Sequence, residues 1–147
     1  MIDVWAAAVA KRRASARVLL VDDDEFVRTI YGRVLAKGGY ETRTVSSAAA
    51  ALMIADDWRP DVILLDIAMP YVTGLEAAPV LKMHPATKNA SLVAFSNYVA
   101  EEDADAMQHL DFDAVLPKPH GADELIEGLK WILLSKDWRL PQKEIDS

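Results

Sequence analysis

The sequence contains no cysteine, so it can form no disulfide and offers no thiolate for catalysis or metal binding. That absence is typical of proteins from a reducing compartment. It also lacks an excess of positive charge: 16 Lys and Arg stand against 23 Asp and Glu, and the formal net charge of −7 argues against a general grip on nucleic acid. No segment is long and apolar enough to span a membrane. We therefore expect a soluble, cytoplasmic protein that binds neither nucleic acid nor membranes.

The chain of 147 residues suits one compact domain, and its 52% hydrophobic content is enough for a core. Residues 1–16 differ from the rest. Their apolar stretch precedes the basic cluster Lys11-Arg12-Arg13, which is the reverse of an export signal. We therefore interpret residues 1–16 as an N-terminal extension that is helical or flexible.

Short apolar runs alternate with longer helical patterns along the chain. The runs predict five strands, at Val18–Val21, Tyr40–Val45, Val62–Leu65, Leu92–Phe95 and Ala114–Leu116. Helices are predicted from Asp23 or Asp24 to Gly38, from Ser46 or Ser47 to about Asp57, over Gly74–Met83, over Ala100–Leu110, and onwards from Ala122. Three of the five runs show no polar alternation, as strands covered on both faces should. The pattern predicts an α/β fold with a parallel sheet between two layers of helices.

Polar residues stand at the ends of four of these predicted strands. They are Asp22 and Asp23 after the first, Asp66 after the third, Ser96 after the fourth and Lys118 after the fifth. In open parallel sheets, functional groups gather at the carboxyl ends of the strands. We therefore expect these side chains to form one site.

The residue types at these ends point to metal and phosphoryl chemistry. Neighbouring carboxylates repel one another, and a divalent cation relieves that repulsion. A site of Asp22, Asp23 and Asp66 without His or Cys suits Mg²⁺ better than zinc. A carboxylate can also attack phosphorus as a nucleophile. The metal, the Lys118 ammonium and the Ser96 hydroxyl would then stabilise the negative charge on the transferred phosphoryl oxygens.

At this point the chain resembles the receiver domain of two-component response regulators. The matching stretches are VLLVDDDEFVR (18–28), DVILLDIAMPYVTGLE (61–76), LVAFSN (92–97) and LPKP (116–119). The resemblance covers residues 17–134. It implies a flavodoxin-like, doubly wound sheet of five parallel strands in the order 2-1-3-4-5, with five helices.

The resemblance also implies a role for each site residue. Asp66 would be the phosphoacceptor, with Ser96 and Lys118 contacting the phosphoryl group. Mg²⁺, or Mn²⁺ in its place, would be bound by Asp22, Asp23, Asp66 and the backbone carbonyl of Ala68. The phosphodonor would be a histidine kinase or a histidine phosphotransfer protein, and a downstream protein would read the signal by docking. Such a domain is not an enzyme beyond catalysing its own phosphoryl transfer and dephosphorylation.

The sequence departs from the family pattern at several positions. Val115 stands where an aromatic switch residue is usual, so the usual coupling of a turning ring to the Ser96 hydroxyl is in doubt. Asn97 replaces the small residue that usually follows the switch hydroxyl. Ala68 and Tyr98 occupy positions that tune hydrolysis of the aspartyl phosphate, and neither is an acid or an amide that would position water. We expect a long-lived phosphoryl group.

Two other functions compete with a phosphorylated receiver. The first is a degenerate receiver that binds partners without phosphorylation; Val115 and Asn97 keep this alternative open. The second is a phosphatase with an aspartyl nucleophile, which would need a second Asp two residues after Asp66. Ala68 stands there instead, so we disfavour the phosphatase.

About thirty residues follow the last predicted strand, enough for one helix and a tail. We therefore expect a stand-alone receiver, with residues 135–147 as an extension of the last helix and a tail. Trp131 and Trp138 are seven residues apart and would share a face of that helix. That face either covers the domain's own core or forms a homodimer or partner surface.

Overall fold

In a computed structural model of the chain, residues 16–69, 73–96, 112–118 and 121–146 are described. They contain a single parallel sheet in the strand order β2-β1-β3-β4-β5. The strands are β1 (Arg17–Val21), β2 (Glu41–Val45), β3 (Val62–Leu65), β4 (Ser91–Ser96) and β5 (Ala114–Pro117). The predicted fold class and strand order are therefore confirmed, with strand ends within two residues of the expected ones.

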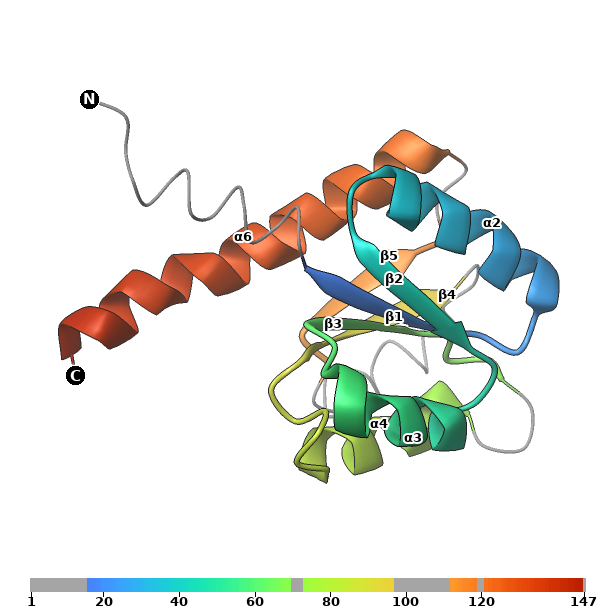
Figure 1. Ribbon diagram of the computed structural model, residues 1–147, viewed down its shortest axis with the longest axis horizontal. Helices are drawn as coiled ribbons and strands as arrows, with labels where there is room; N and C mark the ends of the chain where they lie inside the picture. Colours follow the sequence, from blue (N-terminus) through green and yellow to red (C-terminus); the bar gives the residue numbers. More distant parts are fainter. Residues whose placement is uncertain (1–15, 70–72, 97–111, 119–120, 147) are drawn as a thin grey trace.

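Within the described residues, helices follow β1, β2, β3 and β5 as expected (Figure 1). They are α2 (Glu25–Lys37), α3 (Ala48–Trp58), α4 (Gly74–Met83) and α6 (Ala122–Asp146). The helix predicted over residues 100–110 and the extension over residues 1–16 lie outside the described residues, apart from Ala16. α6 is the longest, and its C-terminal half extends past the edge of the sheet (Figure 1).

Two of the residues predicted to cap helices do so in the structure. The carboxylate of Asp24 accepts hydrogen bonds from the amides of Phe26 and Val27 at the start of α2. The hydroxyl of Ser47 accepts one from the amide of Ala50 in α3. Caps of this kind satisfy amides that have no partner within the helix.

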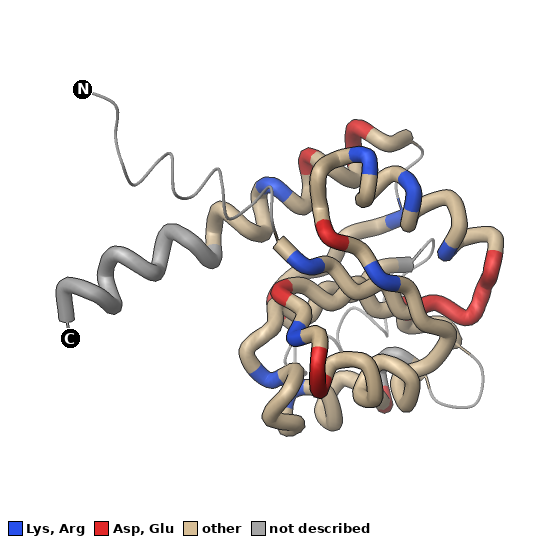
Figure 2. The backbone as a smooth tube through the Cα atoms, viewed as in Figure 1, with Lys and Arg blue, Asp and Glu red and all other residues tan. Residues whose placement is uncertain are grey.

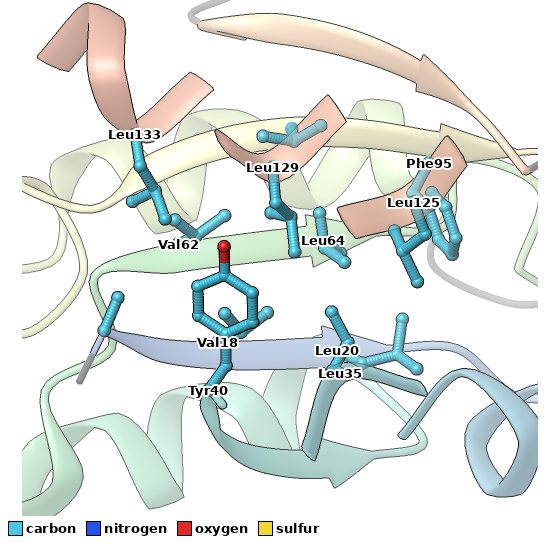
Figure 3. Close-up of a cluster of buried hydrophobic side chains, with 12 residues drawn as sticks. Val18, Leu20, Leu35, Tyr40, Val62, Leu64, Phe95, Leu125, Leu129 and Leu133 are labelled. Atoms are coloured by element: carbon cyan, nitrogen blue, oxygen red, sulfur yellow. The ribbon is translucent and has the colours of Figure 1, made fainter. Parts of the chain in front are cut away.

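The core consists of two layers because side chains alternate across the strands. Val18 and Leu20 of β1 point to the face covered by α2 and α6, where they join Leu35 and Leu129 (Figure 3). The intervening Leu19 and Val21 point to the face covered by α3 and α4. A strand buried on both faces shows no polar alternation in its sequence.

Within the part of the chain that the structure describes, no helix is both long enough and apolar enough to cross a membrane.

Candidate functional site

The register of the sheet brings the acidic residues together. Val21 and Leu65 are partners in neighbouring parallel strands, so the chain leaves β1 and β3 at the same level. The amide of Asp66 donates to the carbonyl of Val21 over 3.0 Å, and the amide of Asp22 donates to that of Val45 over 3.1 Å. These bonds extend the ladders one residue past the strands and hold both aspartates at the carboxyl edge.

Three carboxylates meet at this edge, two from the acidic turn between β1 and α2 and one from the end of β3. Figure 2 shows the acidic turn as a red stretch of the backbone tube. Asp22, Asp23 and Asp66 each offer one oxygen, and the three oxygens lie within 4.8 Å of one another. Asp22 and Asp66 are buried, whereas Asp23 is exposed. The cluster therefore opens to solvent on the side of Asp23.

Backbone hydrogen bonds orient the two buried carboxylates. Oδ1 of Asp22 accepts from the amide of Asp24 over 2.9 Å, and Oδ1 of Asp66 accepts from the amide of Ala68 over 3.0 Å. In both residues this leaves Oδ2 for other contacts. Oδ2 of Asp22 is buried and accepts no directed hydrogen bond from a described residue; its close contact is an ion pair.

That ion pair is made by Lys118, which directly follows β5. Its Nζ atom lies 2.6 Å from Oδ2 of Asp22 and 3.7 Å from Oδ2 of Asp66. The side chain of Lys118 is only 6% exposed, and its ammonium lies 5.8 Å from the ring centre of Phe95. The site thus holds one buried cation among three carboxylates, so its local charge is negative.

Burial raises the pKa of Asp66 above its ordinary value, and the charges of Asp22 and Asp23 act in the same direction. The hydrogen bond from Ala68 and the charge of Lys118 oppose the rise in pKa without cancelling it. A further cation would favour the ionised form. Clustered carboxylate oxygens, one of them without a hydrogen bond, fit a hard divalent ion such as Mg²⁺.

One contact at this site had no signal in the sequence. Nη1 of Arg28 in α2 donates to the carbonyl oxygen of Asp22 over 2.8 Å. This bond ties the first turns of α2 to the acidic turn. In the sequence, Arg28 is one of many polar residues of an amphipathic helix, and only the folded helix shows that its guanidinium turns back toward Asp22.

The other predicted site residues lie only partly within the described part of the chain. Ala68 is exposed in the loop after Asp66, and the backbone of Ser96 ends β4. The side chain of Ser96, and all of Asn97 and Tyr98, lie outside the described residues. Val115 lies in β5 and is 47% exposed. Its neighbours in β5 pack against the α2–α6 layer, so Val115 faces the opposite side of the sheet.

The structure thus has a doubly wound parallel sheet, with a carboxylate cluster and a buried lysine at its carboxyl edge. This is the arrangement expected of a receiver domain. The model of the response regulator receiver domain family matches residues 18–130. The chain therefore belongs to the family of response regulator receiver domains, which act in two-component signalling.

Individual relatives agree with this family. The polar-differentiation response regulator DivK of Brucella anthropi is 29% identical over 113 residues, which cover 77% of this chain and 92% of that protein. The crystal structure of chemotaxis protein CheY4 of Vibrio cholerae is similar with a TM-score of 0.75 and 28% identity, covering 80% of this chain and 98% of that one.

A third structure shows the same fold at lower identity. It is the receiver domain of a sensor histidine kinase of Pseudomonas aeruginosa, with a TM-score of 0.72 and 23% identity, covering 81% of this chain and 98% of that one. In that protein a magnesium ion is coordinated in the active site cleft.

Proposed function

We propose that this receiver domain accepts a phosphoryl group on Asp66 from the phosphohistidine of a histidine kinase or a histidine phosphotransfer protein. The observation that carries the proposal is the position of the Lys118 ammonium, 3.7 Å from the Asp66 carboxylate, beside a cluster of three carboxylates. A nucleophile, a fixed cation and a set of metal ligands are the parts that phosphoryl transfer needs.

In the transfer step, one carboxylate oxygen of Asp66 attacks phosphorus. The new O–P bond forms as the P–N bond to the donor imidazole breaks, and the imidazole leaves with the electron pair. Lys118 then neutralises one of the phosphoryl oxygens. The buried ammonium is suited to this because its charge is little screened by water.

Mg²⁺ would be held by Asp22, Asp23, Asp66 and the backbone carbonyl of Ala68, and Mn²⁺ would substitute for it. When bound, the metal neutralises negative charge on the phosphoryl oxygens. The magnesium ion in the Pseudomonas aeruginosa receiver supports this assignment by analogy of fold. Ser96 would donate its hydroxyl to a further phosphoryl oxygen.

The phosphodonor would dock on α2. Phe26 is 72% exposed and Ile30, one turn later, is 42% exposed. Both lie on the first turns of the helix that begins at the acidic turn. Exposed apolar side chains beside a reactive group are typical of a protein-binding surface. We expect Phe26→Ser to slow transfer from a phosphorylated protein donor while leaving transfer from a small donor unchanged.

Signal readout would run through a docked downstream protein, since the domain catalyses only its own phosphorylation and dephosphorylation. With valine at position 115, the signal would pass through movement of the loops that follow β4 and β5. A degenerate receiver that binds without phosphorylation is the second candidate, favoured by the absence of a ring at Val115. Residence in the cytoplasm stays a prediction.

Acetyl phosphate and beryllofluoride separate the two candidates. With Mg²⁺, acetyl phosphate should add one phosphoryl group to the full chain, as measured by intact-protein mass spectrometry. Asp66→Asn and EDTA should each abolish the addition, whereas the neighbouring Asp24→Asn should not, because Asp24 caps α2. An unmodified wild-type chain that also shows no spectral response to beryllofluoride would favour the degenerate receiver.

A further inference from the structure

A groove lies between α3 and α4, beside the acidic cluster. Its volume is about 540 Å³. Its apolar lining includes Leu52 of α3, Met69 after β3, and Ala77 and Val80 of α4. Figure 1 shows the two helices side by side on one face of the sheet. A groove of this size and lining is typical of a site for a small molecule.

Three of the residues that line the groove are alanines. Ala48 and Ala49 begin α3, and Ala77 of α4 lines the same groove. Methyl groups fill less of the space between two helices than the leucines that fill the α2–α6 layer. Val80 remains 51% exposed at the edge of the groove, so the apolar surface is open to a ligand.

Among the described residues that line the groove, the two charged ones are both acidic. Asp23 and Glu76 contribute to its wall, and both are exposed. Within the described ranges, no Lys, Arg or His forms an ion pair with either carboxylate. Ser46 and Ser47, which precede α3, add hydroxyls to the lining. The wall therefore combines an apolar surface with negative charge that no described cation balances.

We propose that this groove binds a small molecule with an apolar body and one cationic group. The apolar body would contact Leu52, Ala77 and Val80. The cation would lie near Asp23 and Glu76, where complementary charge favours it. An anion of the same shape would meet repulsion at that end.

The proposal has a consequence for signalling that rests on the proposed function of the site. Asp23 lines the groove and also belongs to the carboxylate cluster assigned to Mg²⁺. Two cations that share one carboxylate weaken each other's binding, and by thermodynamic linkage the two effects are equal. The ligand would therefore weaken Mg²⁺ binding, and Mg²⁺ would weaken binding of the ligand. The receiver would thus sense a small molecule as well as a phosphodonor.

A matched pair of probes tests the groove and its charge. Phenylbutylamine and phenylbutyrate share their apolar body and carry opposite charges. With ¹⁵N-labelled full chain in EDTA, the amine should shift the amide resonances of Ala49, Leu52, Ala77 and Val80. We expect a Kd on the order of 1 mM for a ligand of this size. The carboxylate should bind at least about tenfold more weakly.

Two variants of α4 show whether the groove is the site. Val80→Gln should weaken binding of the amine several-fold. Met83→Gln is the matched control, because Met83 is 80% exposed on the same helix and does not line the groove. Glu76→Gln should reduce the preference for the amine over the carboxylate while leaving Mg²⁺ binding unchanged.

Shifts that map elsewhere would overturn the proposal. So would equal affinity for the two probes, or equal effects of Val80→Gln and Met83→Gln. Addition of saturating Mg²⁺ should weaken amine binding about fivefold. A separate Mg²⁺ titration without probes tests the proposed metal site. If Mg²⁺ fails to bind while the amine still prefers the groove, the metal assignment fails and the groove assignment stands.

Discussion

Nζ of Lys118 lies 2.6 Å from Oδ2 of Asp22, closer than the 3.7 Å to Oδ2 of Asp66. Without metal, the charge of the buried Lys118 ammonium is thus balanced mainly by Asp22. A cation bound by Asp22 would take over this partner and free the ammonium for a phosphoryl group on Asp66. The same contact makes Lys118 important for stability as well as for phosphoryl transfer.

Lys118→Met should therefore destabilise the fold. Removing one partner of a buried ion pair leaves an uncompensated charge and costs about 3–5 kcal/mol. The free energy of unfolding from urea titrations in EDTA measures this. Lys130→Met is the control, since Lys130 is 54% exposed and lies 4.0 Å from Glu127, and it should cost less than about 1 kcal/mol. Equal losses for the two variants would mean that the buried pair has no special role.

The raised pKa of Asp66 predicts a pH dependence of stability in the absence of metal. The folded chain holds this proton more tightly than the unfolded chain, so ionisation of Asp66 opposes folding. The protonated Asp66 carboxyl therefore contributes to the free energy of unfolding. This contribution is fully present below about pH 4 and is lost as the pH rises through the pKa of the folded state. Asp66→Asn should therefore be more stable than wild type at pH 7, and the difference should shrink toward pH 4.

Denaturation midpoints in EDTA at the two pH values measure this difference. Asp57→Asn, an exposed change on α3, is the control and should alter the free energy of unfolding by less than about 0.5 kcal/mol at either pH. A variant Asp66→Asn that is less stable than wild type at pH 7 would contradict the expected penalty.

Mg²⁺ should stabilise the wild-type fold through the carboxylate cluster. At a concentration of about 100 times its Kd, a ligand of the folded state adds about 2.7 kcal/mol to the free energy of unfolding. Asp23→Asn should remove most of this gain. Asp24→Asn should keep it, because asparagine also caps helices well and Asp24 is bonded to the amides of α2. Loss of the gain in both variants would argue against a specific site.

The aspartyl phosphate should be long-lived. Ala68 follows Asp66 by two residues, is exposed, and has no side chain that positions a water molecule. Decay of ³²P-labelled protein should take longer than seconds without a phosphatase. Ala68→Glu should shorten the lifetime several-fold by placing a carboxylate near the phosphoryl group. A wild-type phosphoryl group lost within seconds would refute this prediction.

Much of the fold was predictable from the sequence because its signals are local. The apolar run Val62–Leu65 predicts a buried strand, and the structure places β3 over the same residues. Asp24 and Ser47 mark helix starts through caps that need only nearby amides. The strand order followed from the family resemblance, since no local signal states which strands are neighbours.

The candidate site was predictable in its members and not in its contacts. The positions of Asp22, Asp66 and Lys118 directly after predicted strands indicate that they belong to one site, because the carboxyl ends of parallel strands share one edge. That Lys118 pairs mainly with Asp22, and that Arg28 turns back to the carbonyl of Asp22, depends on the packing of α2 and the loops against the sheet. Neither distance follows from spacing along the chain.

The sequence by itself determined the alternation of strands and helices and the residue types at the carboxyl edge, since periodicity and capping are properties of neighbouring residues. Only the tertiary structure decided which carboxylate holds the buried lysine and which residues line the groove between α3 and α4. Both depend on how closely two separate elements approach, and that distance is set by the side chains packed between them.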